Sequence, residues 1–237
     1  MPTTAGSSRT PARSKKTSLF SDHKFFLLFV YLLASLVYYP YVQEHTLSYA
    51  VFRLLGSAGI LLTVYAISLR RTLLICALFL AIPALLQRLL LFRADAGAWS
   101  ILNIVLSFAF DVFVVVIIFR HVFTQQQPNS ETVFGALCIY LLVGFSFSSV
   151  YGMIAALQPT AFYLDPLTNL HVVPDRFDFV YYSFATMTSL GASGITAVSG
   201  QVRSMSIIEA TLGVLYLAVL IARLIAAYRH PSVASRE

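Results

Sequence analysis

Residues 178–203 contain a short apolar stretch within a segment that is otherwise too polar to cross a membrane. Asp178 precedes the apolar stretch, and an Asp in that place can cap a helix that continues to about Ser189. Such a helix is about 18 Å long, well short of the roughly 30 Å hydrocarbon core of a bilayer. Non-helical backbone at membrane depth must be covered by protein or reach water. The sequence therefore predicts that the chain turns back at this point and that Leu190–Thr196 lines a cavity or pore.

The residues at the end of this short helix offer oxygen atoms and the backbone freedom of glycine. The carboxyl end of a helix carries partial negative charge, which favours a cation beside it. Successive carbonyl oxygens of a glycine-containing strand can replace the hydration shell of such an ion. We therefore expect a cation to be coordinated by oxygens of Thr188, Ser189, Leu190, Gly191 and Ala192.

The elements that position this segment are long apolar runs. The chain has 237 residues, of which 58% are hydrophobic and only 11% charged. A soluble domain has about 25% charged residues, so a water-soluble globular protein is excluded. Six runs are long enough to cross a bilayer: 25–42, 51–69, 72–92, 100–119, 132–157 and 204–228. The predicted fold is an all-α membrane protein with six transmembrane helices and a re-entrant segment between the fifth and sixth.

The distribution of charge indicates the orientation of the chain. The formal net charge is +6, and basic residues cluster before the first apolar run: Arg9, Arg13, Lys15, Lys16 and Lys24. No nucleic-acid-binding motif accompanies them, so the positive-inside rule explains them better than a nucleic-acid partner. We expect a multi-pass protein of the cell membrane with both termini in the cytoplasm. Residues 1–23 are expected to form a disordered tail, and 230–237 a short cytoplasmic tail.

The segment from Ser183 to Thr196, which reads SFATMTSLGASGIT, resembles the pore helix and selectivity filter of potassium channels. The resemblance continues from Arg203 through Glu209 and Gly213 to residues 216–224, which are similar to the inner helix of small bacterial members of that family. The six-run layout with one loop before the last run is that of voltage-gated channels. The resemblance implies a four-helix sensor-like domain at 24–123 and a pore domain at 124–229. It also implies a homotetramer, because one loop cannot close a pore.

The filter departs from the usual family pattern, Thr-Thr-Val/Leu-Gly-Tyr-Gly-Asp, at its outer half. Ala192, Ser193 and Gly194 stand where the family has Tyr, Gly and Asp. The resemblance then implies K⁺ at the carbonyl oxygens of Thr188 to Gly191, with weaker selectivity further out. The predicted function is passive conduction of K⁺ as permeant ion, with no cofactor. A poorly selective cation channel and a non-conducting modulatory subunit remain open.

Several polar residues inside the apolar runs invite a functional or a structural interpretation. Asp111 is the only charge in the fourth run, so steep voltage gating is not expected, and Arg88 or Arg53 could pair with it. Glu209 could support the pore loop from behind, as Asp178 could through its cap, or could make an ordinary contact between helices. Gly213 could be a gating hinge or a site of close packing.

Other classes of function lack their motifs. No His/Asp box, GxSxG or HExxH is present, so an enzyme is not expected. A secondary transporter would show broken helices in both halves of the chain. The histidines show no spacing typical of a metal site: His23, His45, His121, His171 and His230.

Overall fold

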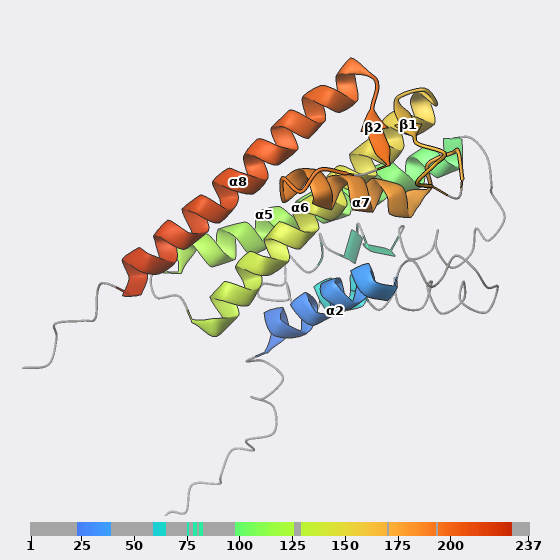
Figure 1. Cartoon of the computed structure of the whole chain (residues 1–237). Coiled ribbons are helices and arrows are strands. Elements are labelled where there is room, and N and C mark those ends of the chain that lie inside the picture. Colours follow the sequence, from blue (N-terminus) through green and yellow to red (C-terminus); the bar gives the residue numbers. More distant parts are fainter. Residues whose placement is uncertain are drawn as a thin grey trace, which may run out of the picture.

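Long helices make up most of the described chain, because backbone in hydrocarbon must satisfy its hydrogen bonds within each segment. The computed structural model describes residues 23–38, 59–64, 75, 78, 79, 81, 82, 98–125, 129–169, 171–192 and 194–228. The elements, shown in Figure 1, are α2 (Lys24–Tyr38), α5 (Ala98–Thr124), α6 (Ser130–Leu157), β1 (Phe162–Leu164), α7 (Arg176–Met187), β2 (Ile195–Ala197) and α8 (Gly200–Tyr228).

Within the described residues, three helical segments are long and apolar enough to cross a membrane. They are Ile104–Thr124, Ser130–Leu157 and Gly200–Ala226. These segments agree with the fourth, fifth and sixth predicted runs, and their length and composition support a helical membrane protein.

The other three predicted runs are described only in part. The first begins within α2, whose 15 residues extend about 22 Å. Most of 51–69 and 72–92 lies outside the described residues. Six spans therefore stay a prediction.

Helix α6 lies at the centre of the fold. It packs against α2, α5, α7 and α8. A capping box begins it: the Thr132 amide donates to Asn129 Oδ1 at 2.9 Å, and the Asn129 amide donates to Thr132 Oγ1 at 3.3 Å. The main core contains Leu28 of α2, Ile118 of α5 and Ile139 of α6, all almost fully buried. This core fixes the helix against which α7 is placed.

A second core lies at the end where α6 stops and α8 begins (Figure 1). Strands β1 and β2 pair antiparallel there, with Leu164 opposite Ile195. The rings of Tyr151, Phe162 and Tyr182 meet edge to face at centroid distances of 5.0 to 5.9 Å. The pairing brings the chain after α6 and the chain before α8 together, so the segment between them leaves and returns at the same end.

The predicted division at residues 123 and 124 coincides with the end of α5 at Thr124. The main core nevertheless continues from α2 and α5 into α6, and Leu220 of α8 belongs to it. Two separate domains stay a prediction, and both predicted tails, 1–23 and 230–237, lie almost entirely outside the described residues.

Candidate functional site

Helix α7 is capped by Asp175 rather than by Asp178, which corrects the sequence prediction. Asp175 Oδ1 accepts from the amides of Phe177 at 2.7 Å and Asp178 at 3.0 Å. Asp178 Oδ2 in turn accepts from the Asp175 amide at 2.8 Å. Either acid fits the residue preferences of a cap, but the reciprocal capping box needs the earlier Asp at the N-cap and the later one at the third helical position. Asp178 supports the start of α7 in that second role.

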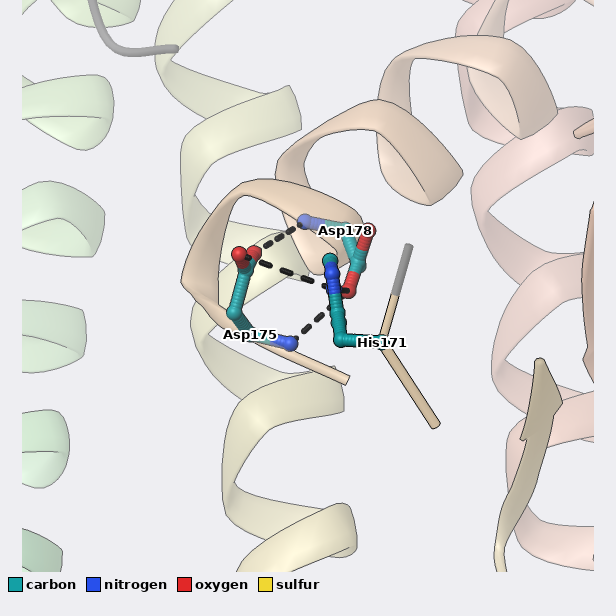
Figure 2. A group of neighbouring side chains, drawn as sticks. All are labelled: His171, Asp175 and Asp178. Atoms are coloured by element: carbon teal, nitrogen blue, oxygen red, sulfur yellow. Dashed lines mark hydrogen bonds and ion pairs between the residues drawn. The ribbon is translucent and has the colours of Figure 1, made fainter. Parts of the chain in front are cut away.

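His171 joins this cap from the preceding loop, as Figure 2 shows. Its Nε2 lies 2.8 Å from Asp178 Oδ2 and 3.7 Å from Asp175 Oδ2. The hydrogen bond to Asp178 raises the pKa of His171 above its ordinary value. One ligand atom from each residue lies within 4.8 Å of the others. His171 lies four residues before Asp175, which lies three before Asp178, and this spacing could have indicated the cluster from the sequence. The contacts within the cluster are explained by the cap of α7.

The carboxyl end of α7 is a Schellman turn with a serine in the left-handed position. Ser189 has a φ of 58°. Its amide donates to the Thr186 carbonyl at 3.0 Å, and the Leu190 amide donates to the Ala185 carbonyl at 2.9 Å. The helix ends at Met187, not at about Ser189 as predicted. Residues 188–190 fold back towards the last turn of the helix instead of continuing it.

The carbonyl oxygens of this turn and of the two residues after it are available as acceptors or ion ligands. Within the described part of the chain, no group donates to the carbonyl oxygens of residues 188–192. Thr188, Ser189, Leu190 and Gly191 are exposed on the single chain, Leu190 to 77%. Gly191 has a φ of 82°, a conformation that favours glycine. Ala192 is partly buried, and Ser193 lies outside the described residues.

Contacts along α6 and α8 give the depth of the end of α7. The Ser183 hydroxyl oxygen lies 2.7 Å from the Gly144 carbonyl oxygen of α6. A Cβ added to Gly213 would lie 2.5 Å from the Met187 carbonyl oxygen. Gly213 lies about 20 Å along α8 from Gly200, in a helix of 29 residues that extends about 43 Å. The end of α7 therefore lies level with the middle of a membrane-length helix.

Glu209 of α8 is fully buried and joins three helices. One carboxylate oxygen accepts from Tyr151 Oη of α6 at 2.6 Å, and the other accepts from the Ser183 hydroxyl of α7. Ser206, one turn earlier, lies 2.7 Å from Tyr182 Oη. From the sequence, Glu209 could either support the pore loop or make an ordinary contact between helices. In the structure Glu209 contacts the helices α6 and α7, not the segment that follows α7. Tyr151 and Ser183 were not singled out from the sequence, where they read as ordinary span residues.

The remaining predicted residues are placed as follows. Gly194 has a φ of 86°, and its carbonyl oxygen accepts hydrogen bonds from the loop after β1. Gly213 lies in an unbroken helix against Met187, which shows close packing, and the hinge stays a prediction. Asp111 is partly buried in α5, and Arg53 and Arg88 lie outside the described residues, so their pairing stays a prediction.

The C-terminal end of α8 carries a further contact. The sequence favours an Arg223 that reaches the lipid headgroups. In the structure its Nη2 donates to the Gln125 carbonyl at the end of α5 at 2.7 Å, and its guanidinium lies 4.6 Å from the centre of the Phe123 ring. Arg223 thus ties α8 to the α5–α6 connection.

The comparisons with known proteins bear on this same region. No curated protein and no solved structure was found to match the chain. Residues 136–230, which contain most of α6 and all of α7 and α8, match a family model described as "Ion channel". The part of the chain that carries the candidate site is therefore similar to an ion channel domain, which supports an ion channel rather than an enzyme as the function of this membrane protein.

Proposed function

We propose that this protein is a homotetrameric cation channel that conducts K⁺ passively through residues 188–194. The observation that carries the proposal is the half-depth end of α7, followed by residues 188–192 with carbonyl oxygens that accept no hydrogen bond within the described chain. Carbonyl groups at that depth need either donors or ions, because lipid supplies neither. A permeant cation meets this need.

The electrostatics favour a cation over an anion. The partially negative carboxyl end of α7 lies next to the carbonyl oxygens of Thr188, Ser189, Leu190 and Gly191. A dehydrated K⁺ needs such a set of oxygen ligands. The inner oxygens, up to Gly191, form the proposed K⁺ sites.

Selectivity is proposed to be weaker than in the family that the filter resembles. Ala192 is too small to brace the outer filter against neighbouring helices, and Gly194 has no carboxylate. A wider outer filter lets a partly hydrated ion occupy it, which reduces discrimination between K⁺ and Na⁺. A poorly selective cation channel is the extreme of the same mechanism.

Assembly into a tetramer is supported by the incompleteness of one chain. Residues 188–191 are exposed on the single chain, so the oxygens of one copy cannot surround an ion. Only 17% of the apolar window of α8 is buried, which leaves faces for lipid and for further copies of the chain. We propose four copies around a central axis, with the lipid bilayer and monovalent cations as the other partners.

The proposed orientation places both termini in the cytoplasm of a cell-membrane protein. The β1–β2 end and the N-terminus of α7 then face outward. His171, Asp175 and Asp178 lie at that mouth, which is consistent with an acidic outer surface that attracts cations.

One observation favours a non-conducting modulatory subunit as the alternative. The turn from Thr188 to Leu190 returns to the Ala185 carbonyl instead of extending. A compact turn presents fewer aligned oxygens than an extended filter. Assembly with a second, conducting chain would then be required for current.

The test is the reversal potential of the purified protein in planar bilayers under a K⁺/Na⁺ bi-ionic gradient. We expect a cation current whose reversal potential is shifted from zero towards the K⁺ equilibrium potential. The current should be lost in Gly191→Asp, which places a charged side chain beside the proposed sites. Reversal at zero would reduce the proposal to a poorly selective cation channel. A wild-type protein that assembles but carries no current would contradict conduction and favour the modulatory subunit.

A further inference from the structure

The loop after β1 closes onto the last residue of the proposed filter. Gly194 stands where the resemblance has an Asp, so its own side chain supplies no polar group. Its carbonyl oxygen instead accepts from the Asp165 amide at 2.9 Å and from Asn169 Nδ2 at 2.8 Å. Two donors from a segment more than 20 residues away in the sequence thus converge on one oxygen. We call residues 165–169 the outer loop.

The amide of Asn169 is held in one orientation. Its Nδ2 also lies 2.9 Å from the Asp165 carbonyl oxygen and 3.2 Å from Thr168 Oγ1. Two of the three neighbours are carbonyl oxygens, which can only accept, so the nitrogen and not the oxygen of the amide must face them. A reversed amide would place oxygen against oxygen. Asn169 therefore acts as a donor towards the filter.

The outer loop is itself a turn closed by internal hydrogen bonds. The amides of Thr168 and Asn169 both donate to the Asp165 carbonyl at 3.1 Å. The Leu167 amide donates to Asp165 Oδ1 at 3.0 Å. The loop also continues the β1–β2 ladder by one step. Asp165, which follows Leu164, donates its amide to Gly194, which precedes Ile195, and Leu164 and Ile195 are the last pair of the ladder. The donor of Asn169 is thus anchored to the same sheet as the end of the filter.

The space beside Gly194 is filled by this loop. A Cβ at Gly194 would lie 2.5 Å from Thr168 Oγ1 and 3.0 Å from Asn169 Nδ2. The φ of 86° at Gly194 independently disfavours a side chain. The outer loop therefore occupies the space that a side chain at position 194 would fill.

We propose that Asn169 is a positioning residue that fixes the outer end of the filter and thereby sets its discrimination between K⁺ and Na⁺. The proposal rests on the proposed channel function and deepens it. The Asn169 amide holds the Gly194 carbonyl, and the outer loop braces the filter from the extracellular side. With the brace removed, the segment from Gly191 to Gly194 widens and accepts Na⁺ more readily.

The test compares Asn169→Asp with Leu167→Ala in planar bilayers under a K⁺/Na⁺ bi-ionic gradient. Asn169→Asp keeps the shape of the side chain but replaces the donor with an acceptor that repels the Gly194 carbonyl oxygen. Leu167 lies in the same loop with a side chain that is 94% exposed, so its truncation is a matched control. We expect the K⁺/Na⁺ permeability ratio to fall about three- to tenfold in Asn169→Asp, as for the loss of one hydrogen bond, and to stay unchanged in Leu167→Ala.

The outcomes separate this inference from the proposed function. A residue with a merely structural role would change the number of active channels but not the permeability ratio of each. If Asn169→Asp conducts with the wild-type ratio, the brace is refuted while the channel stands. If the wild-type protein carries no current, the channel itself is refuted, and the selectivity role with it. Asn169→Ala replaces Asn169→Asp, with the same expected fall, should the charged variant not assemble.

Discussion

In the proposed orientation α8 has an outer, N-terminal half and an inner, C-terminal half, and the two halves are held in the fold by different means. In the outer half, Glu209 is fully buried between Tyr151 of α6 and Ser183 of α7. Among the described residues, two hydrogen bonds join the inner half to neighbouring elements. Tyr216 Oη donates to the Ala136 carbonyl of α6 at 2.6 Å, and Arg223 donates to the Gln125 carbonyl that follows α5.

The difference has an energetic meaning. A buried carboxylate is costly unless every oxygen has a partner, so Glu209 fixes the relative positions of three helices with little tolerance. Among the described residues the inner half has two hydrogen bonds to neighbouring elements but no buried carboxylate, and its apolar contacts can be exchanged for contacts with lipid. The outer half is therefore suited to hold a filter, and the inner half is suited to move. Three predictions test this contrast and a fourth tests the cap of α7, from the largest expected effect to the smallest.

Glu209→Ala is expected to destabilise the protein most. The substitution removes the carboxylate acceptor of the Tyr151 hydroxyl, whereas the Ser183 hydroxyl can still donate to the Gly144 carbonyl, and the expected cost is about 1–3 kcal/mol in the free energy of unfolding. Unfolding in detergent micelles measures the loss. Thr211→Ala is the matched control on the same helix, because among the described residues the Thr211 hydroxyl bonds only to the Ile207 carbonyl of its own helix. Equal stability of the two variants would refute the role of Glu209 in holding the outer half.

Gly213→Ala is expected to have the next largest effect. The added methyl group enters the space of the Met187 carbonyl and side chain, and overpacking of this kind costs about 1–3 kcal/mol. We expect lower stability and a smaller channel current, since the displaced Met187 precedes the proposed ion sites. Gly200→Ala is the control, because a Cβ at Gly200 meets no atom of the described chain within 4 Å, its sequence neighbours aside. A Gly213→Ala protein with unchanged stability would mean that α7 and α8 separate easily at this level.

Arg223→Met tests the inner half. Methionine keeps part of the packing near Phe123 but loses the hydrogen bond to Gln125 and the cation–π contact, each of which contributes about 1 kcal/mol. We expect a several-fold change in open probability, with an unchanged K⁺/Na⁺ permeability ratio in single-channel recordings. Arg203→Met, which loses a bond to the Ala197 carbonyl at the outer end, is the counterpart. A changed permeability ratio in Arg223→Met would contradict the separation of the two halves.

The smallest effect is expected from pH at the outer mouth. The hydrogen bond to Asp178 raises the pKa of His171 above its ordinary value of 6.5. A raised pKa in the folded state means that protonated His171 stabilises the fold. This stabilisation is complete below pH 6.5 and is lost as the pH rises through the raised pKa. Thermal unfolding between pH 6 and pH 9 should show a small decrease in wild type that His171→Ala lacks, and identical pH profiles would contradict it.

The degree to which the sequence predicted the fold differed between elements. The runs 100–119, 132–157 and 204–228 became α5, α6 and α8 with bounds close to those predicted, because a long apolar run in lipid has little choice but to form a helix. The short helix α7 was also expected, but its cap was assigned three residues too late. Two acids at this spacing both satisfy residue preferences, and only the reciprocal hydrogen bonds distinguish them.

The candidate site was less predictable. Residues 188–194 were located through their resemblance to a potassium channel filter, yet the left-handed Ser189 and its Schellman turn were not expected. A serine carries no strong preference for that conformation, so the surrounding packing decides it. Asn169 gave no signal at all, because a single Asn in a polar loop is ordinary in any protein.

The sequence by itself determined the membrane environment, the long helices and the position of a short helix before a glycine-containing segment. Each of these follows from composition and local spacing, which act within a few turns of the chain. The tertiary structure decided what holds that segment: the Glu209 contacts to α6 and α7, the close approach of Met187 to Gly213, and the outer loop on Gly194. These contacts join residues that are distant in the sequence, and their geometry exists only after the helices have packed.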